Sequence, residues 1–156
     1  MESRTPEQES KDSTLEEFRK LEAAQGEYHW ELALEDKGDY LVIYVLMRSK
    51  KNPERKLLAK LKCDDYAQQA PFLEFLNPVA ISDPGLRGDV KPQYYPTGQG
   101  VTTDPARSPM PIVCLPGHRV YHANGWHAAW VFPPPTINQI YFLVDRLQSA
   151  LDHDWS

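Results

Sequence analysis

Two apolar stretches and the turn between them decide the fold: D-Y-L-V-I-Y-V-L-M-R at residues 39–48 and R-K-L-L-A-K-L-K-C at residues 55–63. The first is rich in valine, isoleucine and tyrosine, and the second places Leu57, Ala59, Leu61 and Cys63 at every second position. Both patterns are typical of strands with one buried face. The intervening K-N-P at 51–53 is typical of a turn, so the pair predicts a hairpin.

Two further strands are expected on either side of this hairpin. Residues 28–34 alternate Tyr28, Trp30, Leu32 and Leu34, and K-G at 37–38 supplies a turn into the next strand. Residues 72–76, F-L-E-F-L, follow a proline and form a fourth short strand. The expected arrangement is a four-stranded antiparallel meander over residues 28–76.

A helix is expected at each end of the meander. Ser13 or Thr14 can cap the first, which carries Leu15, Phe18 and Leu21 on one face and ends near Gly26. The second runs from Thr136 to about Leu151, with apolar residues at three- and four-residue spacing. The fold class is therefore α+β, with the C-terminal helix packed on the sheet. Residues 1–12 are expected to be a disordered acidic tail, and residues 13–156 a single domain.

Prolines separate the meander from the last helix. Twelve of the 14 prolines fall between Pro71 and Pro135, and each fixes its own φ and removes a backbone donor. The region 77–135 is therefore expected to be long and irregular, and such loops are often functional.

Composition excludes several classes of function. The net charge is −5 with a pI near 5.5, so binding to nucleic acid or to an anionic membrane is not expected. The longest apolar run is far shorter than the about 20 residues of a membrane span. No signal peptide is visible, and two cysteines do not form a disulfide framework, so a cytoplasmic location is expected. No phosphate-binding glycine motif is present, so no cofactor is expected.

Residues 62–75, K-C-D-D-Y-A-Q-Q-A-P-F-L-E-F, resemble a stretch of the ubiquitin-conjugating enzymes. In that family the third strand leads through Y-P-x-x-P-P-x-x-x-F into the fourth, and Tyr66, Pro71 and Phe75 match its spacing. Ile112–Leu115, I-V-C-L, resembles the segment with the catalytic cysteine of the family. Trp130 and the prolines at 133–135 resemble the segment before the next helix. The resemblance covers about residues 14–151 and is nearest to bacterial relatives of the family.

This resemblance implies a carrier that holds a ubiquitin-like modifier as a thioester on Cys114 and passes it to an acceptor. The expected partners are the modifier and its activating enzyme. The family's H-P-N before the cysteine is missing, since residues 104–111 contain neither histidine nor asparagine. His118, His122 and Asn124, which follow the cysteine, are the candidates for oxyanion support or proton transfer. Cys114 lies in a proline-broken polar segment, whereas Cys63 closes an alternating strand and is expected to be a core residue.

Two alternatives remain open from the sequence. Because H-P-N is absent, the chain can be a catalytically inactive binding module on the same fold that uses the groove beside the last helix. Cys114, His118, His122 and His127 also form a C-x3-H-x3-H-x4-H series that suits zinc. That series has no second pair of closely spaced ligands, because Cys63 stands alone.

Overall fold

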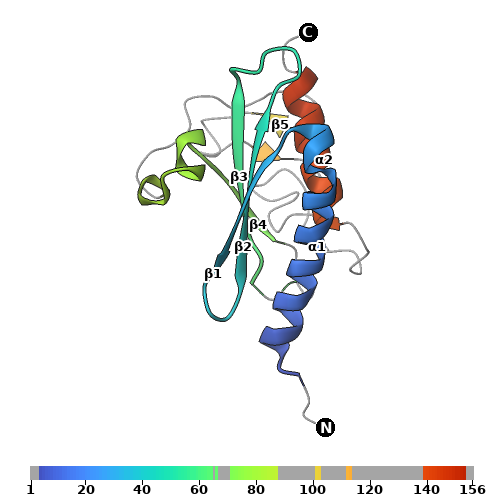
Figure 1. Ribbon diagram of the computed structural model, residues 1–156, viewed down its shortest axis with the longest axis vertical. Helices are drawn as coiled ribbons and strands as arrows, with labels where there is room; N and C mark the ends of the chain where they lie inside the picture. The colour runs from blue at the N-terminus through green and yellow to red at the C-terminus, as the bar shows by residue number, and fades with distance from the viewer. Residues whose placement is uncertain are drawn as a thin grey trace.

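The protein is described from a computed structural model, which covers residues 4–64, 66, 71–87 and 139–153, with the backbone of 101–102 and 112–113. The elements follow the chain in the order α1, β1 to β4, two short 3-10 helices, β5, β6 and α2. Figure 1 shows α1 and α2 side by side on one side of the sheet and the 3-10 helices on the other. The start of α1 and the end of α2 lie toward opposite ends of the long axis.

The meander is confirmed. It consists of β1 (Glu31–Asp36), β2 (Leu41–Arg48), β3 (Lys56–Lys62) and β4 (Phe72–Leu76). The strands are antiparallel and adjacent in chain order. The expected turn at Gly38 is present, where φ of 95° requires a residue without a Cβ. These features confirm the α+β class.

Helix α1 (Pro6–Tyr28) is longer than expected at both ends. Thr5 caps it through a capping box, in which the Thr5 hydroxyl accepts from the Gln8 backbone N–H and the Gln8 side chain accepts from the Thr5 N–H. The expected start at Ser13 or Thr14 is therefore wrong, and residues 6–12, expected in a disordered tail, are helical. The expected end at Gly26 is also wrong, because the helix continues to Tyr28 and His29 takes the left-handed conformation beyond it. Tyr28 is thus helical, and the first strand begins three residues later.

Helix α2 (Gln139–His153) ends two residues after the expected Leu151, and its expected start at Thr136 lies outside the described residues. Its apolar stripe packs against one face of the sheet, as expected. The residues of this stripe form one core with residues of α1 and of the sheet, and each of them exposes less than a tenth of its surface. They include Leu21 from α1, Ile43, Val45 and Met47 from β2, Leu57, Ala59 and Leu61 from β3, and Ile140, Leu143, Val144, Leu147 and Leu151 from α2.

The opposite face of the sheet is covered in part by two 3-10 helices, η1 (Pro78–Ile81) and η2 (Pro84–Leu86). Ala80 packs there with Tyr44, Leu46 and Leu58 in a second, smaller core. Seven of the eight residues of β2 are buried because this strand has cover on both faces. The described part of the region after β4 is irregular apart from these turns and the two-residue strands β5 (Val101–Thr102) and β6 (Ile112–Val113).

Candidate functional site

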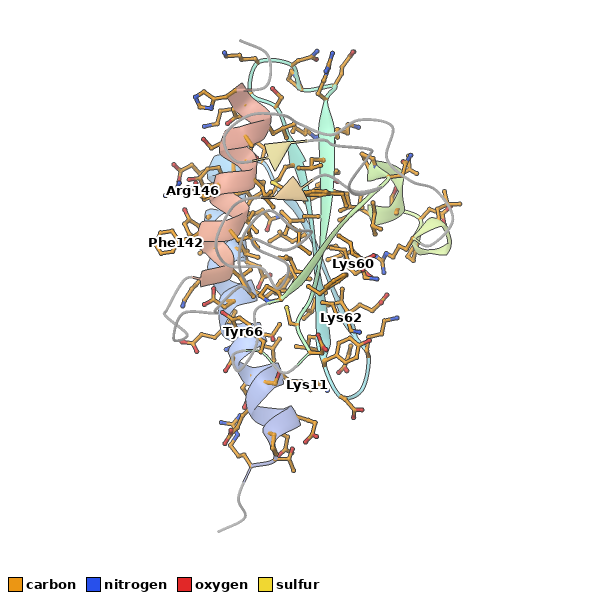
Figure 2. All side chains as sticks on the ribbon, turned by 180° about the vertical axis from the view of Figure 1, so that it is seen from behind. Lys11, Lys60, Lys62, Tyr66, Phe142 and Arg146 are labelled. Atoms are coloured by element: carbon orange, nitrogen blue, oxygen red, sulfur yellow. The ribbon has the colours of Figure 1, made fainter. Side chains whose placement is uncertain are left out.

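The residues predicted to carry the chemistry, Cys114, His118, His122 and Asn124, lie outside the described residues, as does His127. The backbone directly before Cys114 is described. There β6 pairs antiparallel with β5, with Val113 opposite Val101 and Ile112 opposite Thr102. The strands face the viewer in Figure 2, on the side of the molecule opposite the one shown in Figure 1. The chain therefore enters position 114 from a paired strand.

Cys63 is a core residue, as predicted. It has no exposed surface, and its Sγ lies 3.5 Å from the carbonyl oxygen of Leu61. The Ser10 hydroxyl donates to the carbonyl oxygen of Cys63 at 3.4 Å, which joins the first turns of α1 to the end of β3. A thiol in this position is shielded from reagents in the folded protein.

The residues of the β3–β4 connection that support the resemblance are packing residues. Tyr66 and Phe75 keep 3% and 4% of their surface exposed, and Pro71 is buried. Burial is the main cause that raises the pKa of Tyr66, and the nearby Glu17 adds to it. Tyr66 and Phe75 share the core that contains the apolar residues of α2.

A polar network fastens α2 to the beginning of the sheet, and the sequence pattern did not indicate it. The Tyr28 hydroxyl donates to Asp145 at 2.9 Å, and the Trp30 indole donates to Gln148 at 2.9 Å. The Tyr141 hydroxyl lies 3.5 Å from that of Tyr28. These bonds to Tyr141 and Asp145 raise the pKa of Tyr28. Each residue here finds its partner more than a hundred positions away, so local spacing carries no signal for the network.

A second unpredicted cluster surrounds Glu35 on the opposite face. Arg87 lies 2.5 Å from one Glu35 oxygen, and Lys37 lies 2.7 Å from the other. The Arg87 guanidinium also stacks on the ring of Tyr44, 3.9 Å from its centroid. The bond from Lys37 is the main cause that holds the pKa of Glu35 below its ordinary value. The cluster attaches the segment that carries the 3-10 helices to the sheet.

A groove of about 910 Å³ lies beside this segment, between η1 and the end of the β2–β3 hairpin. Apolar side chains line it from β2 and η1, and charged side chains of both signs line it from β1 and the hairpin, Glu31 and Glu54 being the acids. Its lining includes Leu46, Pro78, Val79, Ile81, Arg48, Arg55 and Lys56. The volume falls in the range typical of ligand sites, about 300–1,000 Å³. The sequence indicated only the strands that border it.

The described residues contain neither a cluster of metal ligands nor a membrane-spanning helix. Within the described ranges, no group of three or more His, Cys, Asp or Glu side chains is placed to hold a metal ion. The proposed zinc series lies outside those ranges. None of the described helices has both the length and the apolar content of a membrane span.

Comparison with family models, with curated proteins and with solved structures finds no match to this chain.

Proposed function

We propose that the chain carries a ubiquitin-like modifier as a thioester on Cys114 and transfers it to an acceptor. The observation that carries this proposal is the order of the elements around that cysteine. A helix, a four-stranded antiparallel meander, a strand that ends one residue before Cys114 and a final helix follow one another along the chain. This order resembles that of the ubiquitin-conjugating enzymes.

The burial of Tyr66, Pro71 and Phe75 supports the same proposal. The resemblance between β3 and β4 rests on these three residues. Spacing that arose by coincidence in a surface loop would leave such side chains exposed. Instead all three are buried, and Tyr66 and Phe75 share a core with α2.

The proposed reaction is acyl transfer in two steps. The Cys114 thiol gives up its proton and its thiolate attacks the carbonyl carbon of the activated modifier. The new C–S bond forms, the C–S bond to the activating enzyme breaks, and the sulfur of that enzyme leaves as a thiolate that takes up a proton. An amine of the acceptor then attacks the same carbon, an amide forms, and the Cys114 thiol is released. An oxyanion develops in both steps, and His118, His122 and Asn124 are the candidates to donate to it.

The test uses ubiquitin bearing a C-terminal thioester to a small thiol, which bypasses the activating enzyme. The expected product is a one-to-one adduct on Cys114 that a thiol reductant cleaves. The adduct should be lost in Cys114→Ala and kept in Cys63→Ala. If no adduct forms on the folded protein, or if Cys63 is labelled at the same rate, the carrier proposal is wrong.

A catalytically inactive binding module is the second candidate, and an exposed aromatic residue on α2 favours it. Phe142 is 56% exposed, and Figure 2 shows its side chain and that of Arg146 directed away from the sheet. An exposed aromatic residue beside a cation is a common feature of protein interfaces. In this case Phe142→Ala would abolish binding of the partner protein and Cys114→Ala would leave it unchanged.

A further inference from the structure

The end of the β2–β3 hairpin concentrates positive charge in a chain whose net charge is −5. Residues 48–56, R-S-K-K-N-P-E-R-K, contain five cationic residues and one acid. Three of the cationic residues, Arg48, Arg55 and Lys56, border the groove beside η1, together with the acids Glu31 and Glu54. The local charge therefore runs against that of the whole molecule.

Arg48 and Lys56 are direct partners across the β2–β3 ladder. Like charges directly opposite each other in a sheet are destabilising. Arg48 has one acid within reach, with its Nη2 at 3.1 Å from Glu31, whereas no ion pair is found for Lys56 among the described residues. Lower on the same face, Lys60 stands opposite Glu74 and pairs with it at 3.7 Å, and Figure 2 labels this lysine. Two like charges therefore lie opposite each other at the hairpin end, whereas Lys60, further along β3, lies opposite an acid.

Apolar surface continues from these cations across the groove. Val79 is 51% exposed. It is one of three large apolar residues with an exposed side chain among the described residues, the others being Leu34 at 38% and Phe142 at 56%. Pro78 and Ile81 line the groove beside it. An exposed valine next to two like charges fits a surface that a partner covers, because a carboxylate would relieve the repulsion and an apolar side chain would dehydrate the valine.

We propose that this groove binds an acidic segment of a partner protein. A carboxylate of the segment lies beside Arg48 and Lys56, and an apolar side chain packs on Val79 and Ile81. The apolar lining distinguishes this ligand from a nucleic acid, whose contacts are mainly made through phosphates. Binding of the segment requires no chemistry at Cys114 and is expected whether or not that cysteine carries an acyl group.

The probe is a short fluorescein-labelled peptide in which pairs of glutamates alternate with single leucines, followed by fluorescence anisotropy on the full chain. Binding should weaken as salt is raised. It should be absent for a matched peptide with glutamine in place of glutamate. Lys56→Glu and Val79→Asp should each raise Kd at least about tenfold, which corresponds to about 1.4 kcal/mol.

Lys51→Glu is the matched control. It makes the same change in net charge on the same hairpin, but Lys51 does not line the groove, so Kd should change less than about twofold. Cys114→Ala should bind the peptide as the parent does, which separates this proposal from the carrier proposal. Thermal unfolding of each variant verifies that the fold is intact.

Three outcomes would overturn the proposal. The first is no binding of the peptide at low salt. The second is an RNA oligonucleotide that binds more tightly than the peptide and shows the same sensitivity to Lys56→Glu, which would make the groove a polyanion site. The third is self-association in sedimentation experiments that Val79→Asp abolishes, which would make the occupant a second copy of the chain.

Discussion

The indole N–H of Trp30 donates to Oε1 of Gln148 at 2.9 Å, and both side chains are 2% exposed. This bond joins the residue before β1 to the last helix. The Gln148 amide nitrogen in turn donates to the backbone carbonyl of Arg48 at 2.8 Å and to Asp152 at 2.9 Å. One glutamine of α2 therefore bonds to the residue before β1, to the end of β2 and to Asp152 of its own helix.

Gln148→Leu should lower the free energy of unfolding by about 2–4 kcal/mol, because the Trp30 N–H and the Arg48 carbonyl would lose their partner inside the protein. Urea denaturation measures this change. Arg146→Ala, on the exposed side of the same helix, should change stability by less than about 0.5 kcal/mol. Equal effects of the two substitutions would show that the network contributes nothing.

Glu35→Gln should make the free energy of unfolding depend less on pH in the acid range. The Lys37 bond and the charge of Arg87 hold the folded-state pKa of Glu35 below 4.5. Its stabilising contribution is therefore fully present above that value and is lost as the pH falls through the lower folded-state pKa. The difference in unfolding free energy between the parent and Glu35→Gln should be larger at about pH 7 than at about pH 3. Glu54→Gln, which removes the same charge at an exposed position, is the reference variant measured at the same two pH values.

Lys56→Glu should stabilise the fold by about 0.2–1 kcal/mol, because it converts the like-charge pair with Arg48 into an opposite-charge pair. Lys60→Glu should destabilise it by a similar amount, because Glu74 stands opposite. Chemical denaturation at low salt measures both, and added salt should shrink both effects. The same sign for the two variants would contradict this account.

Cys114 should react with an alkylating reagent at least about tenfold faster than Cys63 in the native protein. Cys63 has no exposed surface, so its labelling requires local or global opening. Peptide mapping by mass spectrometry distinguishes the two sites, and labelling in denaturant provides the reference rates. Slower labelling at Cys114 would remove the basis for assigning it as the nucleophile.

If Cys114 is the acyl carrier, His118→Ala, His122→Ala and Asn124→Ala should each leave loading of Cys114 largely intact. At least one of them should slow discharge to an amine about tenfold or more, and loss of one oxyanion donor typically costs about 10²–10³ in rate. Single-turnover discharge of the loaded protein measures this step. Discharge at the parent rate in all three would make the segment an ordinary surface. Unfolding with loss of a stoichiometric zinc ion would favour the metal site instead.

The start of α1 illustrates where local sequence signals compete. Ser13 with an acidic first turn predicts a cap, but Thr5 caps the helix eight residues earlier through a capping box with Gln8. The earlier turns persist because Ser10 and Thr14 are buried and Ser10 bonds to Cys63, 53 residues away. Polar residues at a helical spacing do not indicate a buried face, so this half of the helix could not be predicted.

The residues of the candidate sites also include some that the sequence predicts and others that it does not. Cys63 could be assigned to the core from alternation alone, and the structure confirms it. The clustering of Glu35 with Arg87 and the groove beside Val79 could not be predicted, because each depends on how the segment after β4 folds back onto the sheet. Pairing of this kind has no fixed spacing in sequence.

The sequence by itself determined the four strands, their antiparallel order and the apolar stripe of the last helix. Period-two alternation, turn residues and helical spacing involve residues that are close in the chain, so they can be recognised in short stretches of sequence. Only the tertiary structure decided which polar side chains are buried, as for Gln148, and which charges meet across the ladder, as for Arg48 and Lys56. The physical reason is that hydrogen bonds and charge contacts depend on distance in space, and packing brings together residues that the chain keeps far apart.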